Sequence, residues 1–209
     1  MDAEKIGASF LSSYKDAKIE LLHDVGMYRH VRISGAHYYR FELMTWPGSL
    51  SVNCEGDEFL FTRTTDMFDF FRRGAGAKCD APNFAYWAEK LSDPRSRKVR
   101  AFDYSAFERD VESVLSTMAD ASRVEEIRDD LQSETCESDE NSCREFLSRH
   151  AELLDLSIDG RWEDWTYRYA YACFAILHGI REYDRVKTSQ GSLPLLDGRE
   201  HHEFPEVSK

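Results

Sequence analysis

The sequence predicts an α+β fold, an antiparallel β-meander of about four strands covered by a C-terminal set of helices. Apolar and polar residues alternate between residues 28 and 63, which is the period of a strand. Between residues 64 and 187 apolar residues recur every three or four positions, which is the period of a helix. Of the 209 residues, 42% are hydrophobic and 13% aromatic, enough to build a substantial core.

The first element is predicted to be an amphipathic helix over residues 2–23. Its apolar residues follow helical spacing, and Gly26 then breaks the pattern. These apolar residues are Ile6, Phe10, Leu11, Tyr14, Ile19 and Leu22.

The meander is predicted next, because short alternating segments are separated by turn residues. In the clearest turn, Pro47 presets its φ angle and Gly48 accepts a positive one. A sheet of this kind needs a cover on one face. Its strands are expected at residues 28–34, 37–45, 50–54 and 58–63.

Helices are predicted to supply that cover. The segment Thr64-Thr65-Asp66 is a candidate N-cap for a Phe-rich helix that Gly74-Ala75-Gly76 ends. The strongest helical pattern, over residues 163–187, has a stripe that includes Trp162 and Tyr169 and predicts a central, buried helix. Other helices are expected at residues 83–91, 105–119, 124–131 and 144–156.

The chain is predicted to form a single domain over residues 1–187, with the sheet at 28–63 and the helices at 64–187. Residues 188–209 contain Gly, Ser, Pro and a His-His pair, which predicts a flexible tail. No apolar run approaches the roughly 20 residues that span a bilayer. The start of the chain carries no secretory pattern, so a cytoplasmic location without membrane contact is expected.

No catalytic or cofactor motif is found, and no cofactor is expected. Cys136 and Cys143 lack the spacing of a zinc site, so no metal is predicted either. No glycine-rich phosphate loop and no serine-hydrolase elbow is present. His178, in the central helix, is interpreted as a satisfied core histidine.

An enzymatic alternative places a site on the sheet around His30 and His37, with Arg40 and Trp46 beside them. The strand pattern puts His30 on the same face as Tyr28 and Arg32. Without a partner motif, the simpler interpretation of His30 is a half-exposed sheet residue.

A third possible function is direct nucleic-acid binding. A basic loop carries Arg95, Arg97, Lys98 and Arg100, which could contact phosphates. The pI of the chain is about 5.1, whereas nucleic-acid-binding domains are typically basic, and this argues against it.

The most informative feature is the placement of negative charge. Residues 101–165 carry 19 Asp and Glu against 6 Lys and Arg, while the net charge of the whole chain is −12. Such a surface repels itself and attracts cationic partners. It is therefore expected to bind a basic protein or nucleoprotein. The predicted contact residues are Glu125, Glu126, Asp129, Asp130, Glu134, Glu137, Asp139 and Glu140.

Several sequence blocks resemble a family of small bacteriophage and prophage accessory proteins. They lie at residues 28–32, 39–48, 66–72, 86–91 and 175–184. The resemblance implies a phage product that acts inside a bacterial cell, and it supplies no active site. Phage accessory proteins of this size often block host defence, so an anti-CRISPR-like inhibitor of a defence effector or nuclease is the leading expectation. The aromatic content permits a homodimer without requiring one.

Overall fold

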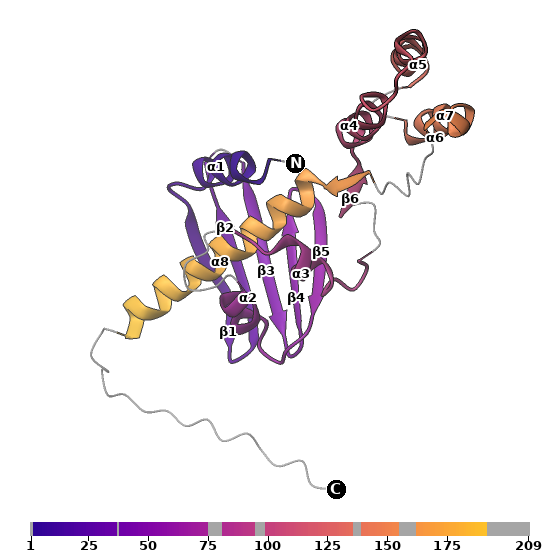
Figure 1. Ribbon diagram of the computed structural model, residues 1–209. Helices are drawn as coiled ribbons and strands as arrows, with labels where there is room; N and C mark the ends of the chain where they lie inside the picture. Colours follow the sequence, from indigo (N-terminus) through magenta and orange to yellow (C-terminus); the bar gives the residue numbers. More distant parts are fainter. Residues whose placement is uncertain are drawn as a thin grey trace, which may run out of the picture.

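The computed structural model describes residues 2–36, 38–74, 81–94, 99–135, 139–154 and 162–191. The chain forms an α+β fold with an antiparallel meander, as predicted (Figure 1). A helix, α1 (Ala3–Ser13), precedes the sheet. The five strands of the main sheet are β1 (Lys18–Val25), β2 (Tyr28–Ser34), β3 (Arg40–Trp46), β4 (Ser49–Cys54) and β5 (Asp57–Thr62).

The five strands lie side by side in chain order, each antiparallel to the next. Two-residue turns join most of them, since Val25 pairs with Tyr28, Trp46 with Ser49 and Cys54 with Asp57. Gly48 has a φ of 84°, the positive value that its turn requires. The short connections follow from this local turn chemistry and confirm the predicted meander.

The prediction of one helix over residues 2–23 is wrong beyond Ser13. The second half of that segment is strand β1, which pairs with β2 along its whole length. Its pairing places Ile19 and Leu21 against the core. A bulge near Leu22 shifts the alternation and makes the apolar spacing resemble that of a helix. The sheet therefore has five strands rather than four.

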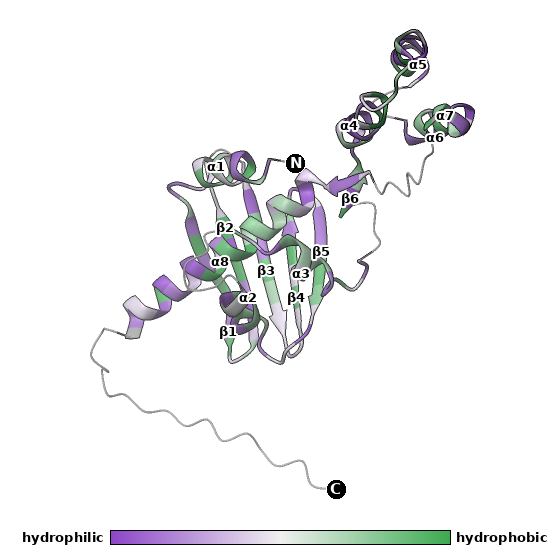
Figure 2. Cartoon of the chain, viewed as in Figure 1, coloured by the Kyte–Doolittle hydropathy of each residue, from purple (hydrophilic) through white to green (hydrophobic). Residues whose placement is uncertain are grey.

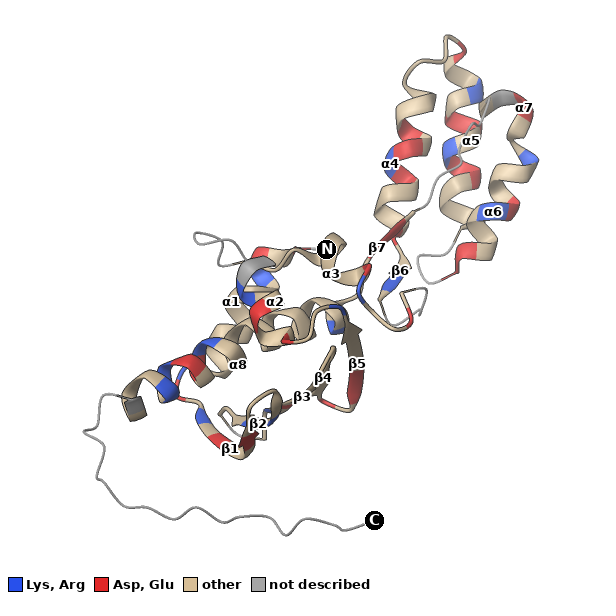
Figure 3. Cartoon of the chain, turned by 90° about the horizontal axis from the view of Figure 1, so that it is seen from below, with Lys and Arg blue, Asp and Glu red and all other residues tan. Residues whose placement is uncertain are grey.

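One face of the sheet is covered by helices and the other is open (Figures 1 and 3). The covering helices are α1, α2 (Met67–Gly74), α3 (Phe84–Ala88) and α8 (Tyr167–Gly191). Asp66 caps α2 as predicted, because its carboxylate accepts the Phe68 amide at 2.9 Å. Because one face of the sheet is covered and the other open, hydrophobic and hydrophilic residues alternate along the strands (Figure 2).

The long helix α8 crosses the sheet, and its middle is buried there, as predicted. It begins at Tyr167 rather than Glu163, because Glu163–Trp165 forms strand β7. It also runs to Gly191, so the predicted tail does not begin at 188; residues 192–209 lie outside the described part of the chain. Among the described helices, none combines the length and the apolar character that a bilayer crossing needs.

A second group of helices, inserted between α3 and α8, stands apart from the sheet (Figure 1). It is attached through the two-stranded ribbon of β6 (Arg100–Phe102) and β7 (Glu163–Trp165). We call α4 to α7 the helical unit. Its helices are α4 (Tyr104–Leu115), α5 (Ala121–Glu134), α6 (Glu140–Arg149) and α7 (Ala151–Leu154).

The helical unit has a hydrophobic core of its own. Phe107 is fully buried against Phe146 and Trp162, with ring centroids 6.2 and 5.0 Å away. The expectation that these helices cover the sheet is wrong, since their apolar faces pack on one another. Trp162, predicted for the stripe of the long helix, belongs to this second core. The single domain over residues 1–187 stays a prediction.

Candidate functional site

The segment that contains the helical unit, residues 101–165, carries 19 Asp and Glu against 6 Lys and Arg, and some of these acids begin its helices. Asp103, Asp120 and Asp139 are N-caps whose carboxylates accept backbone amides of the first turn. An acid at this position also faces the positive end of the helix dipole. Their role is structural, and this includes Asp139, one of the predicted contact residues.

A second part of the charge is neutralised within the unit. Arg128 pairs with Glu112 and so joins α5 to α4, while Arg149 pairs with Glu134 and joins α6 to α5. These pairs orient the helices, but being exposed they add little to stability. Two further pairs lie within single helices, Arg123 with Glu126 at 2.5 Å and Arg144 with Glu140 at 2.5 Å.

The predicted contact residues therefore fall into distinct groups. Glu126, Glu134 and Glu140 face arginines of the unit, and the Asp130 carboxylate lies 3.2 Å from His150 Nε2. Glu137 lies outside the described residues.

Two members of the predicted set, Glu125 and Asp129, are exposed one turn apart on α5. Residues four apart share a helix face, so these carboxylates form one acidic stripe. None of the ion pairs found among the described residues involves either of them, although the charge of Glu125 also helps to raise the pKa of Arg128 on the same helix.

Exposed acids that the prediction omitted enlarge this surface. Glu108 on α4, Glu145 on α6 and Glu152 on α7 all face solvent. Figure 3 shows the acidic residues distributed over all the helices of the unit. The signal that could have found them is the helical phase, because each lies off the apolar stripe of its own helix.

The open face of the sheet carries a second cluster of charges. Glu42, on β3, receives hydrogen bonds from two neighbours on β2: His30 Nε2 lies 2.6 Å from Oε2 and Arg32 Nε lies 2.8 Å from Oε1. Burial alone would raise the pKa of Glu42, but these two hydrogen bonds outweigh it and hold the pKa below its usual value.

His30 thus shares a face with Tyr28 and Arg32, as the strand pattern predicted. Its Nε2 is engaged by Glu42, a pairing that the sequence did not reveal because the two residues are twelve positions apart. His37 lies outside the described residues. Trp46, on the same face, is 40% exposed at the far end of β3.

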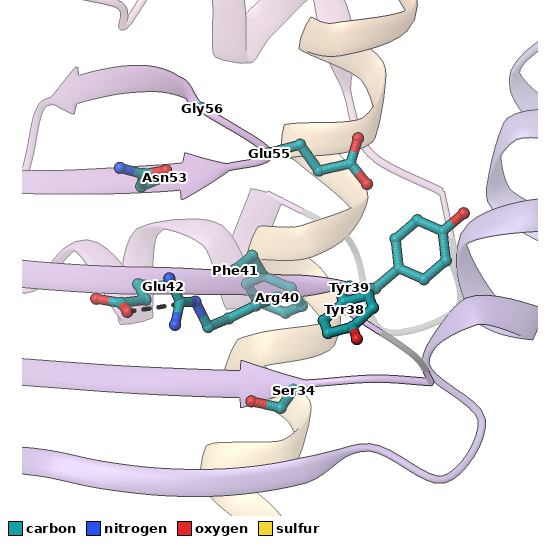
Figure 4. A pocket seen from close by; sticks show the side chains of 9 residues that line it. All are labelled: Ser34, Tyr38, Tyr39, Arg40, Phe41, Glu42, Asn53, Glu55 and Gly56. Carbon is teal, nitrogen blue, oxygen red and sulfur yellow. Dashed lines mark ion pairs between the residues drawn. The ribbon is translucent and has the colours of Figure 1, made fainter.

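A polar pocket of about 450 Å³ opens at the end of the sheet where β2 stops and β3 begins (Figure 4). Arg40 and Glu42 line it, but His30 and Trp46 do not, so of the described residues predicted for an enzymatic site the pocket contains Arg40. Its other lining residues are Ser34, Tyr38, Tyr39, Phe41, Asn53, Glu55 and Gly56.

Of the four cations in the predicted basic loop, Arg100 lies in the described part of the chain. The guanidinium of Arg100 lies 3.7 Å from the centroid of the Trp165 ring and holds the two-stranded ribbon together. Arg95, Arg97 and Lys98 lie outside the described residues.

Metal-binding and nucleophilic groups are sparse in the described part of the chain. Cys54, Cys143 and Cys173 are buried, and burial raises the pKa of the Cys54 and Cys173 thiols far above the usual value. The described residues contain no group of three side chains able to hold a metal ion.

No family model, curated protein or solved structure matches this chain. Its function is therefore argued from the charge and geometry described above.

Proposed function

We propose that this protein acts by stoichiometric binding, and that the acidic surface of its helical unit docks on a basic surface of a nucleic-acid-binding protein. The observation that carries the proposal is the segregation of charge. Residues 101–165 hold 19 acids against 6 cations, and the rest of the chain is close to neutral. Four of these cations are already paired inside the unit, so the surface offered to a partner is more uniformly negative than its composition suggests.

A surface of this kind competes naturally with nucleic acid. A protein groove lined with Lys and Arg attracts any dense array of negative charge, and a rigid acidic helix bundle presents such an array. Occupying that groove would block nucleic-acid binding without turnover. The resemblance to bacteriophage accessory proteins narrows the proposal to a partner in the bacterial cytoplasm, a defence nuclease or a CRISPR effector.

The salt dependence of partner capture tests this proposal. Tagged protein is used to capture partners from host lysate, and the complex is washed at about 0.1 M and about 0.5 M salt, which shortens the screening length from about 10 Å to about 4 Å. We expect a basic nucleic-acid-binding protein to be retained at the low salt concentration and lost at the high one. Retention of the same partner at both concentrations contradicts docking by charge.

Charge reversal locates the contact. Glu125→Lys combined with Asp129→Lys should abolish capture at low salt. Glu4→Lys combined with Asp16→Lys changes the net charge equally on exposed residues around α1, and this control should retain the partner. Equal loss in both variants would mean that net charge, and not the α5 stripe, governs binding.

The alternative, a nucleotide- or nucleic-acid-processing enzyme, would use the cluster on the open face of the sheet. The short distance between His30 Nε2 and Glu42 Oε2 favours it, since a carboxylate can orient a histidine that acts as a base. Nuclease or phosphatase activity that is lost in His30→Gln and unaffected by His23→Gln would support this alternative over binding.

A further inference from the structure

Four tyrosines form a continuous run at the end of the sheet that carries the polar pocket. Tyr39 packs on Tyr14 with ring centroids 6.4 Å apart, Tyr14 on Tyr171 at 6.5 Å, and Tyr171 on Tyr167 at 5.6 Å. The two inner rings are buried, whereas Tyr39 is 42% and Tyr167 51% exposed. The run therefore brings two exposed aromatic rings, Tyr39 just before β3 and Tyr167 at the start of α8, to the same end of the sheet.

Glu55, in the turn between β4 and β5, faces this run of tyrosines. It lines both the 450 Å³ pocket with Tyr38 and Tyr39 and an adjoining hollow of about 130 Å³ with Tyr167 and Tyr171. The negative charge of Glu55 also acts on a buried tyrosine. Burial raises the pKa of Tyr14 to about 12, and the charge of Glu55 contributes to this rise.

The two arginines that line the pocket and the adjoining hollow pair with other residues. Arg40 reaches across the pocket toward Glu42, at 3.9 Å, and in Figure 4 it extends away from the side on which Glu55 lies. Arg168 pairs with Asp57 at 2.9 Å. Among the described residues no cation lies within ion-pair distance of the Glu55 carboxylate, although Glu55 lines both hollows together with tyrosine rings.

The backbone at Glu55 is strained. Its φ angle is 49°, and it is the one described residue other than glycine with a positive φ. Turns of this type favour Asn or Asp followed by Gly at this point, and a long acidic side chain is an uncommon choice there. Strain of this kind is maintained at a functional site more often than elsewhere.

We propose that the tyrosine-lined pocket and its adjoining hollow bind an alkylated ammonium group. Glu55, which lines both, supplies the opposite charge, while Tyr38 and Tyr39 of the pocket and Tyr167 of the hollow supply aromatic faces. Quaternary and methylated ammonium groups are weakly hydrated cations that aromatic rings attract through their negative faces. A carboxylate at the rim adds charge attraction. The same chemistry is found in free choline-like molecules and in methylated lysine side chains of proteins.

Calorimetric titration with matched probes tests the proposal. The probes are choline, its neutral analogue 3,3-dimethylbutanol, a trimethyllysine peptide, and the same peptide with unmodified lysine. We expect choline or the trimethyllysine peptide to bind, and the neutral and unmethylated probes to bind roughly tenfold more weakly or not at all. Preference for choline identifies a small-molecule ligand, and preference for the peptide identifies a methylated protein.

Variants of the turn separate binding from folding. Glu55→Gln should weaken binding of the preferred probe about tenfold, as expected for the loss of one charge contact. Glu55→Gly should weaken binding at least as much while raising the thermal midpoint, because glycine accepts the positive φ. Glu58→Gln, in the same hairpin but outside the pocket, should bind normally. The proposal is overturned if neither choline nor the trimethyllysine peptide binds. It is also overturned if Glu55→Gln binds the preferred probe as tightly as the parent does.

Discussion

At the residue scale, one buried ionic contact joins the β1–β2 hairpin to the helical cover. Arg29 donates two hydrogen bonds to Asp66, at 2.9 and 2.8 Å, and its side chain is only 9% exposed. Its guanidinium lies over Phe68, 4.8 Å from the ring centroid. Burying charge is costly, so each partner depends on the other.

Asp66→Asn should therefore destabilise the protein strongly. The amide can still cap α2, but the buried charge of Arg29 loses the carboxylate to which it is hydrogen-bonded. We expect a loss of about 3 kcal/mol in the free energy of unfolding, measured by urea titration. Adding Arg29→Met should recover much of the loss, because the unpaired charge is then gone. A double variant no more stable than Asp66→Asn would contradict this account.

His178 is a second residue whose environment decides its behaviour. It lies among the rings of Phe10, Tyr14 and Phe41, with centroids 5.7, 6.0 and 6.4 Å away. Its Nε2 is buried and has no hydrogen-bond partner among the described residues, so the prediction of a satisfied core histidine is wrong. Burial lowers its pKa below 6.5, because the charged form loses its hydration.

This depressed pKa makes stability fall with acid. The unfolded chain binds a proton at His178 more readily than the folded one, so the stabilisation is present above pH 6.5 and is lost as the pH falls toward the folded pKa. We expect His178→Phe to lose less stability than the parent between about pH 7.5 and about pH 5.5. The control His23→Phe should keep the pH dependence of the parent, since His23 is exposed. Unfolding curves of His178→Phe with the same pH dependence as the parent would refute this.

At the element scale, the approach of α8 to the sheet depends on a missing side chain. A Cβ atom added at Gly179 would lie 2.5 Å from Leu43 Cδ1 and 3.1 Å from Phe41 Cε2. Both neighbours are essentially fully buried and so have little room to move. Gly179 thus sets the depth at which the helix rests on β3.

Gly179→Ala should destabilise the protein by about 1–3 kcal/mol through overpacking. In a helix without this contact, the same change would add about 1 kcal/mol of stability through helix propensity. Chemical denaturation shows whether the free energy of unfolding of Gly179→Ala is lower or higher than that of the parent. Combining Gly179→Ala with Leu43→Val should restore part of the loss, and a stabilised single variant would show that α8 can shift without cost.

At the scale of the whole molecule, the buried side chains form two clusters. One holds the sheet with α1, α2, α3 and α8, and the other holds the helical unit. The acidic surface lies on the helical unit, which has the smaller of the two cores. Charge repulsion therefore destabilises mainly this unit. A partner that neutralises the surface would stabilise the unit that it binds.

The two clusters should respond separately to mutation. Phe107→Ala removes a fully buried ring and should cost about 3–5 kcal/mol, enough to expose the amides of α4 to α6 to hydrogen exchange. Amides of β2 to β4 should stay protected. The matched control, Phe41→Ala in the core of the sheet, should reverse the pattern. Uniform loss of protection in both variants would support the prediction of a single domain.

Local signals predicted a large part of the fold. The turn at Pro47 and Gly48, the cap at Asp66 and the four strands from residue 28 onward are encoded by neighbouring residues and were confirmed. Strand β1 was missed because its bulge breaks the period-two pattern and its pairing partner lies elsewhere in the chain. The acids of the candidate surface were visible as a charge imbalance, but their division into caps, ion pairs and free carboxylates was not.

The sequence by itself determined the α+β class, the order of most elements and the concentration of negative charge in one segment, because these depend on composition and short-range periodicity. Only the tertiary structure decided that α4 to α7 pack on one another and not on the sheet, that no ion pair among the described residues involves Glu125 or Asp129, and that Glu55 lies beside tyrosines that are distant in the chain. Contacts between residues distant in the chain depend on how apolar faces find partners in space, and a single sequence does not record that choice.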